Sequence, residues 1–491
     1  MSISRVFDDH SLRNRRRTKI VGTLGPASSS PEIIRALISQ GMNCARINGS
    51  HGDHEAHSRT IACVRRMAAE VGRPVAVLFD LQGPKIRTLP GPGLPRQVSK
   101  DEVLEFVPGR STSSNEIGVD HQNLDQDVRA GDPLLIDDGS VATEVLSVER
   151  GKVRCLVKND GVIEARKGVN LPASHVTAPA LTEKDRDDAR FAIAQHVDAI
   201  ALSFVRRASD VAELKALIRE LDPNSDIRVI SKIEKPQALE DLRGILDESW
   251  GVMVARGDLG VELSPEEVPT IQKRIIREAN RLGKPVITAT QMLESMTRNP
   301  RPTRAEASDV ANAVLDGTDA VMLSQETAVG RFPVESVEMM VRILRTTEYY
   351  NRPPITTRRA DRDTLSTPEA VADAACQVAH DLQAHAIVAF TRSGHTALLT
   401  AQRRPPRQIV VFTTNQRLSN LLALAWGVRS YLIEPVGNTD ALLARLDEEM
   451  LKDGLAQPGD CMVLLMGAPA HRMGPPNMMM VHNVGEWTGL E

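Results

Sequence analysis

The sequence has 491 residues, with 60 Lys and Arg against 64 Asp and Glu, a net charge of −4. At about 100–200 residues per domain, this length predicts roughly three domains. The small acidic excess and the 3% of aromatic residues argue against nucleic-acid binding, which needs a basic surface and aromatic rings for base stacking.

Cysteine usage and hydropathy exclude two further classes of protein. The 5 cysteines are odd in number and form no C-x-x-C pair, so we expect buried thiols in a reducing compartment rather than disulfides or a zinc site. No apolar run approaches the ~18 residues that span a bilayer. The arginines near residue 15 precede no apolar stretch, and Asp8 and Asp9 weaken a transit-peptide interpretation. We expect a cytoplasmic protein without a membrane partner, in which residues 1–17 form a tail or a short helix.

From Thr18, short apolar segments alternate with helical patterns. Strands are predicted at Thr18–Gly25, Met42–Asn48 and Val75–Asp80. Helices are predicted over Pro31–Gln40 and His54–Val71. Such alternation is typical of βαβ units and a parallel sheet.

Residues 84–177 interrupt this alternation. The stretch is rich in Pro, Gly and Val, and turn signals occur at Pro90–Gly93, Gly131–Pro133 and Asp138–Gly139. No long helical period occurs in it. We therefore predict a small β-barrel domain, inserted between the third strand and its helix.

The α/β alternation resumes at Thr182 and supplies five more strands. They are predicted at Ala199–Phe204, Arg228–Glu234, Gly251–Leu259, Pro285–Met292 and Ala320–Ser324. Eight strand–helix units predict a (β/α)8 TIM barrel. An open doubly wound sheet is the alternative, but no G-x-G-x-x-G turn marks one.

A third region follows a Pro-containing breaker and a charged segment. From Pro368 it is again α/β, with strands at Ala386–Phe390, Gln408–Phe412 and Cys461–Met466. The predicted domains are a barrel of residues 18–83 and 178–352, an inserted lid of residues 84–177 and a C-terminal α/β regulatory domain of residues 353–491.

Polar residues gather where the barrel strands are predicted to end. They are Arg46, Asn48, Ser50, Asp80, Lys232, Glu234, Asp258, Thr288, Thr290, Ser324 and Glu326. Residues at i and i+2 on a strand share a face, and the carboxyl ends of TIM-barrel strands carry the active site. These side chains are therefore candidates for one site.

The charges at this predicted site indicate its chemistry. Glu234 and Asp258 are carboxylates without His or Cys, which suits Mg²⁺ or Mn²⁺. The alternative is that Glu234 only pairs with a neighbouring lysine, Lys232 or Lys235. Arg46, Arg87 and Lys232 add cations that match phosphate. A divalent ion with convergent cations favours phosphoryl transfer, which depends on positioning and charge stabilisation.

A set of ordered motifs carries a family resemblance. The motifs are Thr23–Ser28, Met42–Gly52, Asp80–Thr88, Lys167–Pro172, Ser231–Glu234, Met253–Gly260, Ala289–Met296 and Arg301–Glu306. Together they resemble the pyruvate kinase family over residues 18–491. The resemblance implies transfer of a phosphoryl group from phosphoenolpyruvate to ADP, giving pyruvate and ATP in the last step of glycolysis. It also implies Mg²⁺ or Mn²⁺, a lid that excludes water, and a homotetramer.

The resemblance also implies roles for individual residues. Catalytic roles fall on Lys232, Arg46, Arg87, Thr290 and Ser324. Substrate contacts fall on Arg46, Lys232, Gly257, Asp258 and Thr290. Nucleotide contacts fall on Pro26, Asn48, His51, Arg87 and Lys167. Glu234 and Asp258 would hold the divalent ion.

The chain departs from the common family pattern at several positions. Gly49 replaces a Phe and Gln325 replaces a Gly, and we expect activity to survive both changes. The positions that match a K⁺ site in many members are Asn48, Ser50, Asp80 and Leu81. Nearby, Lys85 replaces a Glu, which resembles a branch that uses this ammonium in place of K⁺. We predict that K⁺ is not required; the alternative is that Lys85 is a solvated hinge residue.

The C-terminal region offers a candidate effector site. Its residues are Thr391, Arg392, Ser393, Gly394, His395 and Thr396. Such a loop is an ordinary strand-to-helix turn or an anion nest, and the family resemblance implies a phosphorylated metabolite. Arg403 and Arg404 would help to bind it or be solvated.

Two rival functions remain at this stage. Another phosphoenolpyruvate-handling barrel would share the acid pair but lack the inserted and C-terminal domains. A non-catalytic relative would lose Lys232, Glu234 or Asp258, and the sequence retains all three.

Overall fold

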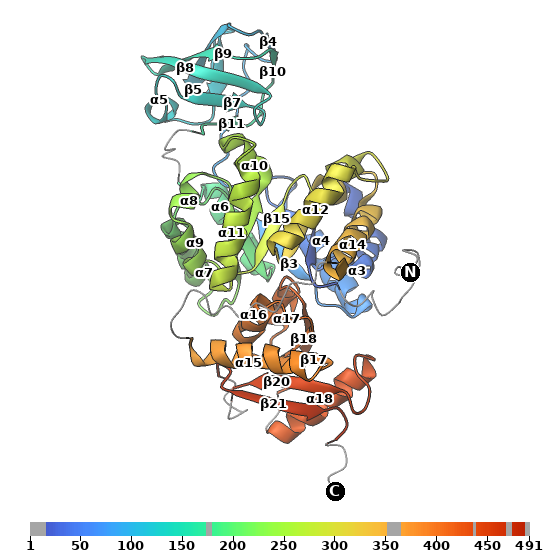
Figure 1. The fold of residues 1–491 in the computed structure, drawn as a ribbon. Coiled ribbons are helices and arrows are strands. Elements are labelled where there is room, and N and C mark those ends of the chain that lie inside the picture. Colours follow the sequence, from blue (N-terminus) through green and yellow to red (C-terminus); the bar gives the residue numbers. More distant parts are fainter. Residues whose placement is uncertain (1–15, 173–178, 351–364, 436–437, 468–473, 487–491) are drawn as a thin grey trace.

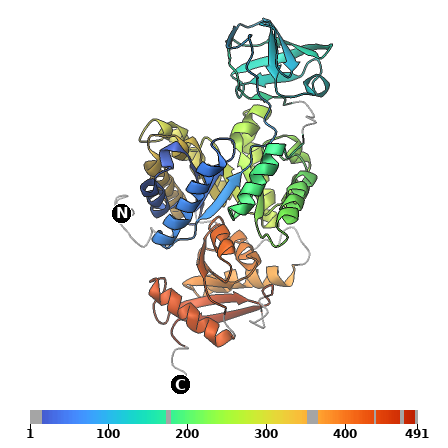
Figure 2. The same ribbon diagram turned by 180° about the vertical axis from the view of Figure 1, so that it is seen from behind.

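The computed structural model describes residues 16–172, 179–350, 365–435, 438–467 and 474–486. Three bodies follow one another in a row, with the barrel between the inserted β domain and the C-terminal domain (Figures 1 and 2). Most of the predicted N-terminal tail and the predicted boundaries near residues 177 and 352 lie outside the described residues. Within these ranges, no helix combines the length and the apolar character that a membrane crossing requires.

The central body is a closed barrel of eight parallel strands, which confirms the TIM barrel over the open sheet. Around the barrel the strands run in the order β1-β16-β15-β14-β13-β12-β3-β2. Their bounds are β1 (Lys19–Leu24), β2 (Cys44–Asn48), β3 (Ala76–Asp80), β12 (Ala199–Leu202), β13 (Arg228–Ile233), β14 (Gly251–Ala255), β15 (Val286–Ala289) and β16 (Ala320–Leu323).

Helices surround this barrel. The long ones are α3 (Pro31–Gln40), α4 (His54–Val71), α6 (Glu183–Ala194), α7 (Ala208–Leu221), α11 (Val268–Leu282), α12 (Arg304–Asp316) and α14 (Pro333–Tyr350). Short ones are η1 (Pro26–Ser28), α8 (Gln237–Glu240), α9 (Leu242–Glu248), α10 (Arg256–Glu262), η2 (Glu294–Thr297) and α13 (Gln325–Ala328). Helices α3 and α4 have the predicted bounds because Ser30 and Asp53 cap their first turns.

The structure corrects one predicted strand and one predicted site residue. The predicted strand Gly251–Leu259 ends at Ala255, and Asp258 lies in the first turn of α10. A short apolar run fits a buried strand and a buried helix equally well. Thr288 faces the surrounding helices, with its hydroxyl 2.9 Å from that of Thr318, so it lies outside the predicted site.

The inserted domain is a half-barrel of antiparallel and parallel strands above the carboxyl ends of the barrel strands (Figure 1). Its elements are β4 (Arg96–Val98), β5 (Val103–Pro108), β6 (Glu116–Val119), α5 (Leu124–Asp127), β7 (Pro133–Ile136), β8 (Val141–Glu149), β9 (Lys152–Val157), β10 (Gly161–Ile163) and β11 (Val169–Asn170). Leu104, Phe106 and Ile117 are fully buried in its own apolar core. The structure therefore confirms the small β domain that composition and turn signals predicted.

The C-terminal domain is a five-stranded sheet in the order β19-β18-β17-β20-β21, with β21 antiparallel to β20. Its elements are α15 (Thr367–Asp381), β17 (Ala386–Phe390), α16 (His395–Gln402), β18 (Gln408–Thr413), α17 (Gln416–Leu422), β19 (Val428–Leu432), α18 (Thr439–Lys452), β20 (Cys461–Met466) and β21 (Met478–Asn483). The predicted strands correspond to β17, β18 and β20. Edge strands β19 and β21 were missed. Both are partly exposed; β19 lacks a continuous apolar run, and the four apolar residues that begin β21 were not recognised as a strand.

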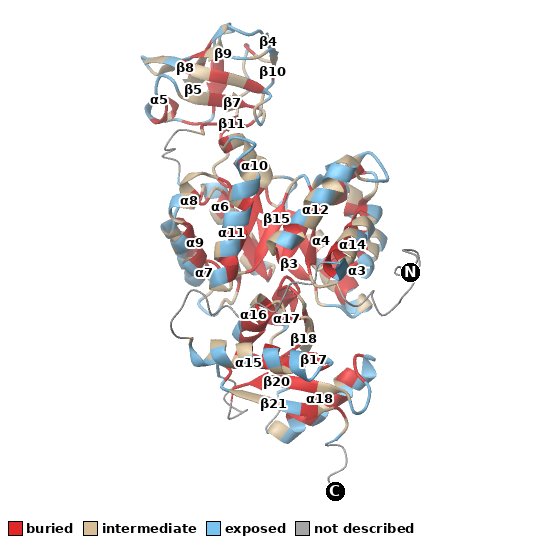
Figure 3. Ribbon diagram, viewed as in Figure 1, coloured by how far each residue is buried: buried red, intermediate tan, exposed pale blue. Residues whose placement is uncertain are grey.

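This domain closes the base of the barrel. Leu421 and Leu424 join the buried cluster inside the barrel, and Figure 3 shows the buried barrel strands above α17. Polar contacts flank this plug: Asn420 donates to Asp198 over 3.2 Å, and Lys19 Nζ donates to the Val428 carbonyl over 2.6 Å. The opposite end of the barrel is left for the polar strand ends.

Candidate active site

Four charged side chains from three strand ends meet at the mouth of the barrel. Arg46 Nε and Nη2 each lie 2.6 Å from Asp80 Oδ2. Lys232 Nζ lies 2.8 Å from Glu234 Oε1 and 3.5 Å from Asp80 Oδ1. Residues 46, 80 and 232 belong to β2, β3 and β13 or their ends, so the barrel brings together groups that are far apart in sequence.

The charges of this cluster stabilise one another. Burial alone would lower the pKa of Lys232, but attraction to Asp80, Glu234 and Asp258 outweighs it and raises the pKa. Burial would raise the pKa of Asp80, yet Lys232 and Arg46 hold it below its usual value. The site therefore presents a permanently charged ammonium beside a permanently charged carboxylate.

Of the two buried carboxylates in this cluster, Glu234 has the raised pKa and Asp80 the lowered one. Burial raises the pKa of Glu234 to about 7 despite the nearby Lys232. Its Oε2 accepts from the Phe204 N–H over 2.6 Å, whereas Oε1 has the Lys232 ion pair and no geometrically aligned hydrogen bond in the described part of the chain. Such an oxygen can coordinate a metal cation while it remains paired with Lys232.

These carboxylates fit a hard divalent cation. Asp258 lies on α10 and its side chain is 27% exposed, so one donor is buried and the other faces the mouth. Among the described residues, no three His, Cys, Asp or Glu side chains are grouped so that they could hold a metal ion by themselves. A two-carboxylate set matches Mg²⁺ or Mn²⁺, which keep water and substrate oxygens as their remaining ligands. Lys235, one partner in the salt-bridge alternative, pairs instead with Glu262 at 2.5 Å.

Thr290 and the first turn of α10 form a second wall of the site. Thr290 follows β15 with φ of 68°, a left-handed conformation that is costly for a β-branched residue. Its hydroxyl oxygen accepts from the Gly257 N–H over 2.7 Å, and its carbonyl accepts from Arg256 over 2.6 Å. The strained turn thus holds the Thr290 hydroxyl against the α10 N-terminus.

Ser324 follows β16 with its hydroxyl buried and without a hydrogen-bond partner within the described ranges. Its N–H donates to Glu326 over 2.7 Å. Glu326 is itself buried and also accepts from the Leu293 N–H, so this carboxylate holds main chain. The Ser324 hydroxyl is therefore a buried polar group whose hydrogen-bonding capacity the described residues leave unused.

Two of the nucleotide candidates, Asn48 and His51, lie at the end of β2 and in the loop that follows it. The Ser50 N–H donates to Asn48 Oδ1 over 3.2 Å, and His51 is exposed. Pro26 is exposed at the start of η1. A Cβ at Gly49 would come within 3.1 Å of Phe79 Cε1, so this chain fills with Phe79 the space that a side chain at 49 would need.

The lid holds the remaining candidates away from the charged cluster. Arg87 donates to the Arg166 carbonyl over 3.3 Å, and Lys167 pairs with Asp137 at 3.0 Å. Lys85 lies where the lid meets the barrel, 4.0 Å from Asp258 and 3.9 Å from Asp138. Its side chain is 29% exposed, which makes it partly buried.

Three of the four K⁺-site positions already have protein partners, and the Asn48 side chain accepts from the Ser50 N–H. The Asp80 carboxylate is engaged by Arg46 and Lys232. The Leu81 carbonyl accepts from the Ser203 hydroxyl over 2.7 Å. The same hydroxyl accepts from Lys232 Nζ over 2.8 Å.

Ser203 and Thr23 were missed by sequence reasoning. Ser203 links Lys232 to Leu81, and Thr23 Oγ1 accepts from Arg46 over 3.1 Å. Both are buried polar residues at or just after the end of a barrel strand. The rule that selected the other strand-end residues would have found them.

The candidate effector loop opens α16. The Thr391 hydroxyl oxygen accepts from the Gly394 N–H over 2.9 Å, and Ser393 is exposed. Gly394 has φ of 84°, a conformation that glycine adopts without strain. The loop leads directly into the N-terminus of α16, where free main-chain N–H groups can bind an anion.

The two arginines after this loop are structural and not solvated. Arg403 pairs with Asp373 and donates to the Leu399 carbonyl over 2.7 Å. Arg404 donates to the Gly317 carbonyl over 2.6 Å and lies 3.2 Å from Asp319 of the barrel. These contacts leave Arg404 as a link between the two domains.

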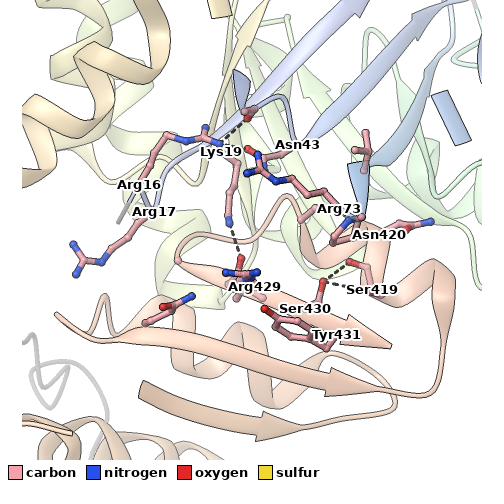
Figure 4. Close-up of a pocket in the computed structure, with 18 of the residues that line it drawn as sticks. Arg16, Arg17, Lys19, Asn43, Arg73, Ser419, Asn420, Arg429, Ser430 and Tyr431 are labelled. Carbon is pink, nitrogen blue, oxygen red and sulfur yellow. Dashed lines mark hydrogen bonds between the residues drawn. The ribbon is translucent and has the colours of Figure 1, made fainter. Parts of the chain in front are cut away.

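A cavity of about 2280 Å³ lies beside these direct contacts and is lined by residues of both the barrel base and the C-terminal domain. Figure 4 shows Arg16, Lys19 and Arg73 of the barrel facing Arg429 and Tyr431 across it. Its described lining includes no residue of the charged cluster at the mouth. We place the chemistry at the strand ends because catalysis in this fold belongs there.

Comparisons with known proteins agree over nearly the whole chain. The family model described as pyruvate kinase, barrel domain matches residues 15–337, and the one described as pyruvate kinase, alpha/beta domain matches residues 369–482. The pyruvate kinases of Sporosarcina psychrophila and Geobacillus stearothermophilus are each 44% identical over 476 residues, which are 96% of this chain and 81% of each relative.

A solved structure shows the same overall fold. The pyruvate kinase of Cryptosporidium parvum superposes with a TM-score of 0.92 at 35% identity. The match covers 99% of this chain and 100% of that one.

Proposed function

Because the chain belongs to the pyruvate kinase family and has its activity, the transfer of a phosphoryl group from phosphoenolpyruvate to ADP, we propose how its own residues carry out that transfer. The observation that carries the proposal is the cluster of Arg46, Asp80, Lys232 and Glu234 at one barrel mouth. A coupled assay of pyruvate formation tests it directly, and no ADP-dependent pyruvate formation would overturn it.

Lys232 and Arg46 bind the phosphoryl group as it moves. Asp80 holds both cations in place, so their positive charges can stabilise the phosphoryl group without reorganisation. Lys232 is buried and carries its full charge, which makes it the residue best placed to stabilise the transfer. Arg87 and Lys167 reach the nucleotide phosphates from the lid.

Glu234 and Asp258 would hold the divalent cation that the family uses. When bound, that ion neutralises phosphate and enolate oxygens as a Lewis acid. The Gly257–Asp258 main chain and Thr290 hold the substrate carboxylate. Closure of the lid excludes water, so that ADP with Asn48, His51 and Pro26 around it is the acceptor.

Proton delivery completes the reaction. The enolate left by phosphoryl transfer takes a proton at carbon to become pyruvate. Thr290 and Ser324, whose hydroxyl has no hydrogen-bond partner among the described residues, follow the neighbouring strands β15 and β16. We assign to them the proton path, through a water held between them.

We also propose that the enzyme does not require K⁺. The Lys85 ammonium lies 4.0 Å from Asp258, where it supplies a fixed positive charge beside the metal carboxylate. The Asp80 and Leu81 oxygens, which would help to hold K⁺, are engaged by Arg46, Lys232 and Ser203. These contacts support replacement of the ion by protein cations.

Regulation is the last part of the proposal. A phosphorylated metabolite binds the Thr391–Thr396 nest, and the protein is a homotetramer, as the family resemblance implies. The arrangement that supports an effector role is the position of Arg392, which lines the cavity between the C-terminal domain and the barrel.

Replacing Glu234 with glutamine should weaken metal activation about tenfold or more, because a neutral amide is a poorer ligand for a hard cation. The measurement is activity against Mg²⁺ or Mn²⁺ concentration. Glu213→Gln, which alters a surface carboxylate paired with Arg186, is the control. An unchanged half-saturating metal concentration would show that Glu234 serves only as the ion-pair partner of Lys232.

Ser393→Asp should abolish the response to a phosphorylated effector while sparing basal turnover, because it adds a negative charge to the nest. The coupling lost should be on the order of 1–3 kcal/mol. Phosphoenolpyruvate saturation curves with and without sugar phosphates and nucleoside monophosphates measure it, and Ser393→Ala is the uncharged control. A normal response in the aspartate variant contradicts this site.

A further inference from the structure

The first turn of α6 holds the nucleotide loop through one lysine. Lys184 Nζ donates to the Gly49 carbonyl over 2.6 Å and to Asp188 Oδ2 over 2.6 Å. Asp188 is buried on the same helix, and its other oxygen lies 2.8 Å from His54 Nε2. Lys184 therefore connects a fixed buried carboxylate to the main chain of the loop that follows β2.

Among the described residues, few other contacts fix the position of this loop. The Gly49 N–H donates to the Asp80 carbonyl over 2.9 Å, but the next two N–H groups bond only within the loop. The Ser50 and His51 N–H groups both donate to Asn48. Gly49 offers no side chain, and a Cβ would come within 3.1 Å of Asp188 Oδ2. Its carbonyl is thus the contact by which α6 holds the loop.

The same turn also holds the segment that leads into the lid. Asp185, fully buried, accepts from the Gly83 N–H over 2.9 Å. It also caps α6 through Thr182, whose hydroxyl donates to it over 2.6 Å. Gly83 has φ of 70°, and a Cβ there would meet Phe204 Cδ2 at 2.8 Å. Adjacent residues 184 and 185 therefore tie the nucleotide loop and the start of the lid to the first turn of α6.

We propose that Lys184 is a positioning residue for the nucleotide, which acts by fixing the Asn48–His51 loop relative to the lid. This inference rests on the proposed placement of Asn48 and His51 at the nucleotide. The reaction requires the acceptor oxygen of ADP to line up with the phosphoryl group, and small misplacements lower such rates strongly. Lys184 sets that alignment from behind the loop, without touching phosphoenolpyruvate.

The test is the KM for ADP in Lys184→Met, measured at saturating phosphoenolpyruvate and Mg²⁺. We expect KM for ADP to rise about tenfold, with KM for phosphoenolpyruvate within about twofold of the wild type. Lys184→Arg keeps the charge and can still donate to both the Gly49 carbonyl and Asp188, so it should recover most of the ADP affinity. Arg190→Met removes another α6 cation, paired with Asp187 on the surface, and should change neither KM.

The outcomes separate this inference from the proposed function. Equal changes in both KM values with a lowered Tm, or an unchanged KM for ADP, overturn the positioning role. Asn48→Ala and His51→Ala decide the premise: if neither raises the KM for ADP, the proposed nucleotide site fails. If they raise it and Lys184→Met does not, the inference about Lys184 alone fails. Lys184→Gln provides the same measurement should the methionine variant not fold.

Discussion

Replacing Lys232 with methionine should lower kcat about 10²–10⁴-fold, the range for single electrostatic groups in catalysis. The Lys232 ammonium is 2.8 Å from Glu234 and 3.5 Å from Asp80 in a site where its side chain is 11% exposed. It stabilises charge that builds up only as the phosphoryl group moves, so kcat should fall more than substrate affinity. Methionine keeps the length of the side chain without its charge.

The measurement is steady-state turnover with KM for phosphoenolpyruvate and ADP, alongside a melting curve. The variant leaves Asp80 and Glu234 facing each other without their shared cation, so some loss of stability accompanies the loss of turnover. Lys215→Met, which breaks a surface pair with Glu248, is the matched control. Turnover within a few-fold of wild type in a folded Lys232→Met enzyme would remove Lys232 from its role.

Lys85→Glu should reduce activity on the order of 10²-fold in K⁺-free buffer and regain part of it when K⁺ is added. The change replaces an attraction at about 4 Å from Asp258 with a repulsion, and a charge pair at that distance is worth at most about 4 kcal/mol at an effective dielectric near 20. Solvent at this partly exposed site reduces that figure. A monovalent cation would restore part of the missing positive charge.

The assay uses a tetraalkylammonium salt to hold ionic strength constant, with K⁺ and Na⁺ removed. The wild-type enzyme should have near-full activity under these conditions. Lys85→Met separates loss of the ammonium from gain of the acid, and Lys100→Glu, on the lid surface, controls for charge reversal alone. A large stimulation of the wild type by K⁺ would falsify the replacement of the ion by Lys85.

The barrel and the candidate site differ in how far the sequence could predict them. Alternating apolar and helical segments predicted all eight strands, because each βα unit carries its own hydrophobic period and caps. Strand ends such as Asp80 and Lys232 could be named as neighbours because the closed barrel puts every carboxyl end at one mouth. Strand length was less legible: the run after Gly251 continues into α10, since apolar residues alone do not distinguish a buried strand from a buried helix.

Only the tertiary structure decided which charges meet. Nothing in the local sequence pairs Arg46 with Asp80, or places Ser203 between Lys232 and the Leu81 carbonyl. Arg403 and Arg404 illustrate the same limit: a sequence shows two arginines beside a candidate anion loop, but the fold uses Arg404 to bind the barrel at Gly317. The reason is physical: hydrophobic periodicity is a local property of the chain, whereas the partner of a charged side chain depends on which distant segments the closed barrel and its docked domains bring within a few ångströms.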